Sequence, residues 1–90
     1  TGNDKAAVAA LHKSERLRDA LIADDAALTK FIAQFPDVNV QEVRQLIRNA
    51  RKEAEGNKPP KSARALYKLI YAMVLPPIVL EATEEKNDEE

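Results

Sequence analysis

Four segments of this chain carry apolar residues at three- and four-residue spacing, and short helix-breaking runs separate them. In the clearest segment, Leu28, Phe31, Ile32 and Phe35 occupy positions i, i+3, i+4 and i+7, which places all four side chains on one helical stripe. The composition agrees, because Ala, Leu, Lys and Glu are abundant whereas only two Phe and two Tyr are present. We therefore predict an all-α protein, a small antiparallel bundle of three to four helices.

Polar residues and a proline bound the first two predicted helices. Residues 4 to 23 form the first pattern, and Asn3 is its expected N-cap. Asp24 and Asp25 break this pattern, and either carboxylate is suited to cap the second helix. The second helix is expected to end before Pro36, because the residue preceding a proline is pushed out of the α region. The apolar face of the first helix is expected to comprise Val8, Leu11, Leu17, Leu21 and Ile22.

The third predicted helix begins at a capping box. Asn39 precedes Glu42 by three residues, and Val38 and Val43 are placed to form the accompanying hydrophobic staple. Gly56 is the expected C-terminal cap of this helix. Its apolar side is expected to comprise Val40, Val43, Leu46, Ile47, Ala50 and Ala54.

A short connector with two adjacent prolines leads to the fourth predicted helix. Ser62 is the expected cap of this helix, and Pro76-Pro77 are expected to end it. The last ten residues are acidic and polar, and residues 83–90 are predicted to be disordered. The chain is therefore divided into a helical bundle at 1–80 and an acidic tail at 81–90.

The formal net charge of −1 conceals a separation of charge along the chain. Residues 44–68 carry a net charge of +6, whereas residues 1–43 carry −2 and residues 81–90 carry −5. Only Glu53 and Glu55 interrupt the basic segment, whereas a merely soluble helix face normally mixes both signs. Cations from two helices and their connector can converge on one concave surface, which favours a polyanionic partner over a solvated face.

Residue types that usually carry chemistry are sparse in this sequence. His12 is the only histidine and there is no cysteine, whereas a structural zinc site requires four convergent ligands. Ser14 and Ser62 have no matched base, and the two glycines do not form a phosphate-binding loop. We therefore predict no enzyme activity, no cofactor and no metal. Tyr67 and Tyr71 could stack on unpaired bases, but a half-buried pair is the favoured interpretation.

The sequence shows no targeting signal. Its N-terminus lacks a basic region followed by an apolar one. The longest apolar run, Leu69–Leu80, is interrupted by Pro76-Pro77 and is shorter than the ~20 residues that a spanning helix needs. We therefore expect a cytoplasmic protein without a membrane segment. Because the start at Thr1 opens within a helical pattern, the chain is interpreted as a fragment.

The central stretch is similar to a known family. The run from Leu46 to Arg64, LIRNARKEAEGNKPPKSAR, resembles the signature of the YjgA family of bacterial ribosome-associated proteins, also called DarP. Upstream, the segments LHK at 11–13 and LRDALI at 17–22 resemble the helix that precedes this signature. The turn at Phe35-Pro36-Asp37 matches the family's aromatic–proline–aspartate turn.

This resemblance implies a fold, a function and a set of partners. Family members are longer, cytoplasmic, all-helical proteins built as two small bundles, so this chain would be the C-terminal bundle. They associate with late precursors of the large ribosomal subunit, aid maturation of its peptidyl-transferase region and have no known catalytic activity. The implied partners are this precursor and its rRNA. Ribosomal proteins are further candidate partners, and a second copy of the chain is a candidate partner at the edge left open by the missing half.

The resemblance and the charge pattern together select the candidate site. Arginines suit forked phosphate contacts, whereas lysines act as point charges. The expected RNA-binding residues are Arg44, Arg48, Asn49, Arg51, Lys52, Lys58, Lys61 and Arg64. The residues expected to shape the loop are Gly56, Pro59, Pro60 and Ser62.

Two alternatives use the same charge pattern. The first is a protein-interaction module that binds an acidic partner segment or a helix of another protein. The second is autoinhibition, in which acidic residues 81–90 fold onto the basic surface and mask it. The leading hypothesis is a ribosome biogenesis factor that binds rRNA of the large-subunit precursor and stabilises one arrangement of it by binding energy alone.

Overall fold

The computed structural model of the chain describes residues 2–88, and the side chains of residues 4–80. The described part consists of helices and has no strand. The four helices are α1 (Gly2–Ala23), α2 (Ala26–Gln34), α3 (Val40–Glu55) and α4 (Lys61–Asp88). The predicted all-α bundle is confirmed.

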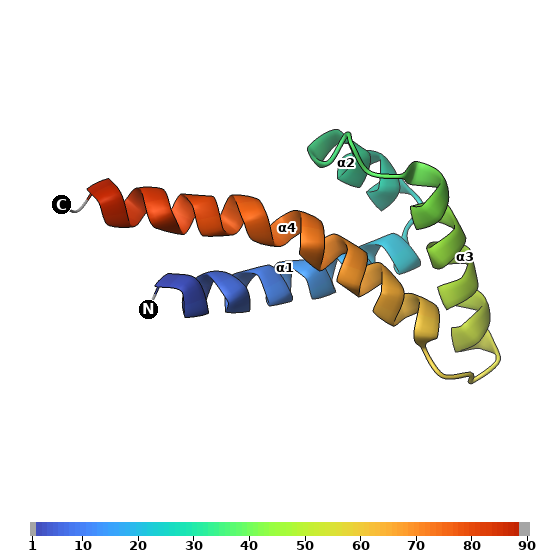
Figure 1. Cartoon of the computed structure of the whole chain (residues 1–90). Helices are drawn as coiled ribbons and strands as arrows, with labels where there is room; N and C mark the ends of the chain where they lie inside the picture. The colour runs from blue at the N-terminus through green and yellow to red at the C-terminus, as the bar shows by residue number, and fades with distance from the viewer. Residues whose placement is uncertain (1, 89–90) are drawn as a thin grey trace.

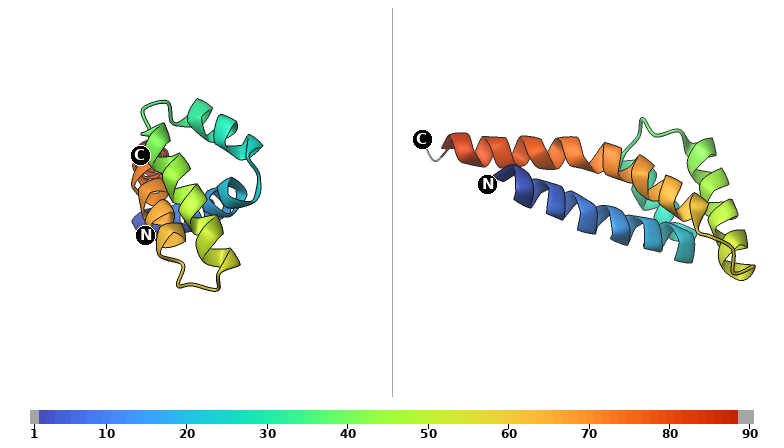
Figure 2. Two further views of the ribbon diagram at one scale, coloured as in Figure 1. Left: turned by 90° about the vertical axis from the view of Figure 1, so that its right-hand side faces the viewer. Right: turned by 60° about the horizontal axis from the view of Figure 1, so that its bottom comes forward.

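The two long helices form the axis of the molecule. α1 and α4 lie side by side and antiparallel, so that the beginning of α1 and the end of α4 are at the same end (Figures 1 and 2). α3 packs against α4 and α1 at the opposite end, and α2 packs against α1. The molecule is elongated, with extents of 53 × 25 × 17 Å. The first half of α1 and the second half of α4 therefore extend beyond the other helices as a two-helix arm.

The core lies where the four helices meet. Leu21 of α1, Phe31 of α2, Val43 of α3, and Leu66 and Ile70 of α4 are each at most 1% exposed. Burial of such side chains stabilises a fold by about 1.5–3 kcal/mol each. The predicted stripe of α2 is confirmed, because its other members pack around this cluster. They are Leu28, Ile32 and Phe35.

Small residues of α1 face α4. Ala6, Ala10 and Ser14 recur every fourth position and are 3%, 0% and 0% exposed. The Ser14 hydroxyl donates a hydrogen bond of 2.6 Å to the Ala10 carbonyl oxygen, which satisfies it within the helix. The predicted apolar face is wrong in this half of α1, because Val8 and Leu11 are 54% and 38% exposed. The small side chains, and not the larger apolar ones, face α4 here, because they allow the axes of the two helices to approach closely.

The start of α3 agrees with its predicted capping box. The Asn39 side-chain oxygen accepts a hydrogen bond of 3.1 Å from the backbone N–H of Glu42. Val38 and Val43, the predicted staple, are both buried. α2 ends at Gln34, one residue before the pre-proline position, as predicted.

The remaining predicted caps differ from the structure in part. Asp24 Oδ1 accepts a hydrogen bond of 2.9 Å from the N–H of Ala26, so this carboxylate serves the start of α2. Asp25 is the N-cap residue by position but makes no side-chain cap hydrogen bond. The predicted cap at Asn3 is wrong, because α1 already begins at Gly2.

α4 passes through Pro76-Pro77, so the predicted stop at these prolines is wrong. Proline removes a backbone donor and crowds the preceding turn, which normally ends or kinks a helix. Both prolines lie on the exposed side of α4, whereas Val74 is fully buried and Ile78 packs against the core. This packing keeps the helix continuous in spite of the two missing donors.

The helical backbone continues to Asp88, so the boundary predicted at residue 80 does not coincide with a helix end. The division into a bundle at 1–80 and an acidic tail at 81–90 stays a prediction. Thr1, Glu89 and Glu90 lie outside the described residues.

One stretch of α4, Lys61–Leu80, is long and apolar enough to cross a membrane by length and composition, with a mean hydropathy of 1.4. The prediction of no membrane segment depended on Pro76-Pro77 interrupting this run, whereas α4 is continuous through both prolines. Within the described residues this is one helix of that kind, which by itself is weak evidence for a membrane segment.

Candidate nucleic-acid interface

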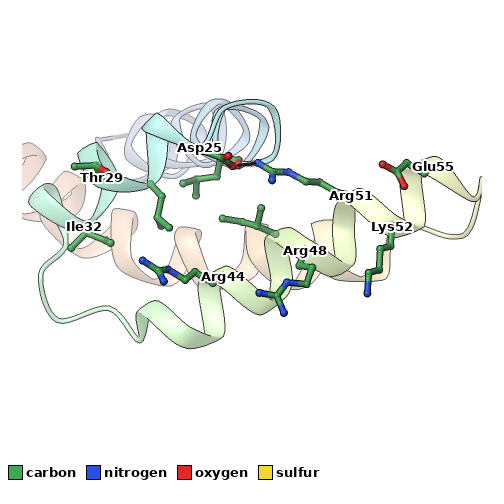
Figure 3. Close-up of a pocket in the computed structure, with 11 residues that line it drawn as sticks. Asp25, Thr29, Ile32, Arg44, Arg48, Arg51, Lys52 and Glu55 are labelled. Atoms are coloured by element: carbon green, nitrogen blue, oxygen red, sulfur yellow. Dashed lines mark hydrogen bonds and ion pairs between the residues drawn. The ribbon is translucent and has the colours of Figure 1, made fainter.

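Four of the predicted cations line one groove between α2 and α3 (Figure 3). The groove encloses about 600 Å³. Its basic residues are Arg44, Arg48, Arg51 and Lys52. Its apolar residues are Leu21 of α1, Leu28 and Ile32 of α2, and Ile47 of α3.

The spacing along α3 explains this gathering of charge. Residues three or four positions apart share one face of a helix, and the basic residues begin at Arg44 and recur at this spacing. Their face adjoins the buried face formed by Val43, Ile47 and Ala50. Arg44 extends toward the α2 side of the groove, whereas Lys52 points away from α2 (Figure 3). Arg44 therefore stands beside the apolar floor, whereas Arg48, like Lys52, projects from α3 on the side away from α2 (Figure 3).

Arg51 is bound within the chain. Its Nε donates a hydrogen bond of 2.8 Å to the Ile22 carbonyl oxygen, and Nη2 lies 3.4 Å from the Leu21 carbonyl oxygen. Nη2 also pairs with Asp25 Oδ1 at 2.8 Å. α1 has no basic residue in its last turn, so Arg51 supplies the cation for the unsatisfied carbonyls at this helix end. Arg51 thus links α3 to α1 and to the start of α2.

Glu53 caps α4 from the preceding helix. Its Oε1 accepts a hydrogen bond of 2.9 Å from the Ser62 N–H, and Oε2 accepts one of 2.6 Å from the Ser62 hydroxyl. These two bonds, the hydroxyl first, lower the pKa of Glu53 from its ordinary value. The prediction that Ser62 caps α4 is wrong, because the helix begins at Lys61 and the Ser62 hydroxyl donates to Glu53.

The turn after α3 is a Schellman motif. The Lys58 N–H donates to the Glu53 carbonyl at 2.8 Å, and the Asn57 N–H donates to the Ala54 carbonyl at 3.3 Å. Gly56 is the C-cap residue, as predicted, but its φ of −90° requires no glycine. Asn57 instead holds the left-handed position, with φ of 53°.

Both prolines of the connector accept hydrogen bonds from the start of α4. The Lys61 N–H donates to the Pro59 carbonyl at 2.8 Å, and the Arg64 N–H donates to the Pro60 carbonyl at 3.1 Å. This geometry leads the chain directly into α4. The shaping role of Pro59 and Pro60 in an RNA-binding loop stays a prediction.

The structure separates the predicted RNA-binding residues into two groups. Lys58, Lys61 and Arg64 are exposed on the connector and the first turn of α4, outside the lining of the groove. Asn49 is half-buried on α3 and accepts a hydrogen bond of 3.1 Å from Gln45 Nε2. The expected single concave surface is therefore divided into the α2–α3 groove and a separate exposed basic cluster.

The tyrosine pair is half-buried, as favoured from the sequence. The ring centroids of Tyr67 and Tyr71 are 6.0 Å apart with an interplanar angle of 28°. Arg18 of α1 lies over Tyr67, 5.8 Å from the ring centroid, and is held by Asp19 at 3.0 Å. This contact was not predicted, because it joins helices distant in the sequence.

Sequence reasoning also missed the far wall of the groove. Leu28 and Ile32 belong to the predicted apolar stripe of α2, and Thr29 beside them had no predicted role, but all three line the groove. The helical spacing identified the stripe, but part of it stays open because α2 packs against α1 and not closely against α3. Within the part of the chain that the structure describes, no three His, Asp or Glu side chains could hold a metal ion together.

Comparison with known proteins identifies the family of the chain. The model of the family described as "Dual-action ribosomal maturation protein DarP" matches residues 1–71. The chain belongs to the DarP family. The family resemblance stated from the sequence is thus confirmed, and the match covers α1, α2, α3 and the first part of α4.

Curated DarP proteins match the same region. The chain is 56% identical over 69 residues to the DarP of Burkholderia ambifaria, which covers 77% of this chain and 34% of that protein. It is 55% identical over 69 residues to the DarP of Cupriavidus metallidurans, with the same coverage. It is 53% identical over 76 residues to the DarP of Paraburkholderia xenovorans, covering 84% of this chain and 37% of that protein. The chain therefore spans about a third of the length of these relatives. No solved structure matches the chain.

Proposed function

We propose that this chain acts in ribosome maturation by binding rRNA of the large-subunit precursor. The support is its membership of a family whose curated members are named ribosomal maturation proteins. Because the chain spans about a third of those relatives, the role of the whole protein is carried over here as part of the proposal. The rRNA and the large subunit are the partners that the resemblance and the charge pattern suggest.

The RNA-binding part of this proposal rests on a row of exposed cations on α3 that form no ion pair within the described residues. Arg44, Arg48 and Lys52 follow one another at four-residue spacing, about one helical turn. All three are exposed, and none forms an ion pair within the described residues. Such a row can neutralise successive phosphates and release their counterions. Arg51 belongs to the same groove but is largely occupied by α1 and Asp25.

The exposed basic cluster extends this surface. Lys58, Lys61 and Arg64 stand on a turn fixed by the Schellman motif and by the Glu53–Ser62 pair. A fixed turn loses little conformational entropy when its cations bind phosphates. The proposed activity is non-catalytic: the protein stabilises one arrangement of immature rRNA and leaves when the mature arrangement competes better. A protein that works on ribosome precursors in this way acts in the bacterial cytoplasm.

Autoinhibition by the acidic end is disfavoured within one molecule. α4 remains helical to Asp88, and its end lies at the opposite end of the molecule from α3 (Figure 1). A straight continuation of α4 therefore carries residues 81–88 away from the groove.

The arm favours a second candidate function, a protein-interaction surface. Val8 and Leu80 are 54% and 58% exposed, and Leu11 is 38% exposed. Exposed apolar residues gathered on one part of a molecule commonly mark a protein contact. Another protein of the precursor, or a second copy of this chain, would cover this arm while the groove binds RNA.

Salt-dependent RNA binding tests the leading proposal. The variant Arg44→Glu/Arg48→Glu/Lys52→Glu should weaken binding to rRNA fragments at least tenfold and flatten the dependence of affinity on salt. A control with the same charge change, Lys5→Glu/Arg16→Glu/Lys30→Glu, alters exposed residues of α1 and α2 outside the groove. Equal affinities of the two variants would contradict the assignment of the site.

A further inference from the structure

We propose that the groove between α2 and α3 receives one unpaired nucleotide of the bound RNA. Its base would lie on the apolar floor and its phosphate at the cationic edge. This inference rests on the proposed function and adds to it the kind of RNA element that the groove recognises.

The floor of the groove fits a base better than a phosphate. The accessible apolar surface of the groove comes mainly from the half-buried Leu28 and Ile32 on the α2 side, because Ile47 and Leu21 are only 7% and 1% exposed. A paired RNA helix presents mainly phosphates and 2′-hydroxyls, which gain nothing from an apolar surface. An unpaired base has two apolar faces and is commonly bound by protein surfaces of this kind. The volume of about 600 Å³ lies within the usual range of small-molecule sites, ~300–1,000 Å³.

The edge of the groove supplies charge where the phosphate of such a nucleotide would lie. Arg44 extends toward Ile32 and stands beside the floor, while Arg48 and Lys52 continue the row along α3 (Figure 3). Guanidinium groups bind phosphate oxygens in a forked geometry. A base in the groove would therefore remain connected to backbone phosphates held along the same helix.

The acidic residues of the groove do not oppose this arrangement. Asp25 is paired with Arg51 at 2.8 Å, so its charge is locally balanced. Glu55 lies at the end of α3, beyond Lys52, and so stands away from Arg44 (Figure 3). Thr29 adds an exposed hydroxyl to the α2 wall, which can serve as donor or acceptor for the edge of a base.

An acidic protein segment is the competing occupant of such a groove. It would present single carboxylates, whereas a nucleotide combines a flat apolar base with a phosphate on one unit. The apolar floor directly beside the row of cations matches this combination. The nucleotide is therefore the occupant that the observations favour.

The test uses two RNA hairpins with the same stem, one of which carries a one-nucleotide bulge. Fluorescence anisotropy with the whole chain should show at least tenfold tighter binding of the bulged hairpin. Thr29→Trp, which places an indole in the groove, should reduce the affinity for the bulged hairpin to that for the paired one. Gln34→Trp is the matched control, because Gln34 is exposed on α2 and does not line the groove. Should the indole disturb folding, Thr29→Met fills the same space with a more flexible side chain.

Each outcome separates this inference from the proposed function. Equal binding of the two hairpins, with Thr29→Trp without effect, overturns the nucleotide site while leaving RNA binding by the cations intact. Binding of neither hairpin overturns the proposed function as well. Displacement of the bulged hairpin by free uridine monophosphate at micromolar concentration would show a free-nucleotide site instead. Displacement by an acidic amphipathic peptide, at a concentration where the mononucleotide has no effect, would assign the groove to a protein partner.

Discussion

The Glu53 carboxylate, near the end of α3, accepts two hydrogen bonds from Ser62, the second residue of α4. The backbone N–H and the hydroxyl of one residue are thus bound by one side chain of the preceding helix. This contact closes the turn that carries Lys58 and Lys61, so it fixes the exposed basic cluster relative to α3.

Replacement of Glu53 should destabilise the fold through this cap. Glu53→Ala leaves the Ser62 N–H without its acceptor, and the melting temperature is expected to fall by several degrees. Glu55→Ala removes an equal charge from the same helix without removing a cap. A thermal melt followed by circular dichroism should separate the two variants, and equal melting temperatures would contradict the capping role.

Stability should also depend on the ionisation of Glu53. Its pKa is lowered in the folded chain below the ordinary value of 4.5, chiefly by the Ser62 hydroxyl. The stabilisation is therefore present above the unfolded-state pKa and is lost as the pH falls from that value through the lowered folded-state pKa. The decline of melting temperature between about pH 5 and pH 3 should be shallower in Ser62→Ala. Identical pH profiles of the two proteins would argue against this linkage.

Gly56 and Asn57 should respond oppositely to substitution. A Cβ on Gly56 would meet its nearest atom, Lys58 Cε, at 3.4 Å, an ordinary contact, so Gly56→Ala is expected to be neutral or to stabilise by up to about 1 kcal/mol. Asn57 has φ of 53°, so Asn57→Val should cost about 1–2 kcal/mol, whereas Asn57→Gly should be tolerated. Urea denaturation of the three variants checks this order, and a loss of stability in Gly56→Ala would contradict it.

Arg51 and Arg48 should separate stability from RNA binding. Arg51→Ala removes the hydrogen bonds to the end of α1 and the pair with Asp25, and a loss of about 1–2 kcal/mol is expected. Arg48→Ala removes an exposed cation that forms no ion pair within the described residues, so stability should stay within about 0.5 kcal/mol. RNA affinity should fall in Arg48→Ala. A larger loss of stability in Arg48→Ala than in Arg51→Ala would overturn the distinction.

Local patterns predicted the helices and several of their ends. The stripe at Phe31 and the capping box at Asn39 depend on residues within a few positions of one another, and both agree with the structure. Family membership was likewise available from one continuous run, Leu46 to Arg64, because a long motif needs no tertiary information.

The predictions were wrong at positions where residues distant in the sequence determine the local structure. Pro76-Pro77 would end an isolated helix, but packing against α1 keeps α4 continuous. Ser62 was predicted to cap α4, but the cap is the carboxylate of Glu53 on the preceding helix, which accepts hydrogen bonds from Ser62. By sequence, Arg51 is one of several basic residues on α3. Its role differs because it lies beside the end of α1 and donates a hydrogen bond to the Ile22 carbonyl oxygen. The groove has the same origin, because it depends on how α2 and α3 each pack on α1 and on no local pattern.

Sedimentation of the tagged chain from bacterial lysate through a sucrose gradient, at low and then at high salt, tests the central claim most directly. We expect the chain to comigrate with large-subunit particles at low salt and to be released at high salt. Comigration should be lost in Arg44→Glu/Arg48→Glu/Lys52→Glu and retained in Lys5→Glu/Arg16→Glu/Lys30→Glu. A chain that stays at the top of the gradient at both salt concentrations, or a groove variant that sediments like the unaltered chain, would contradict it.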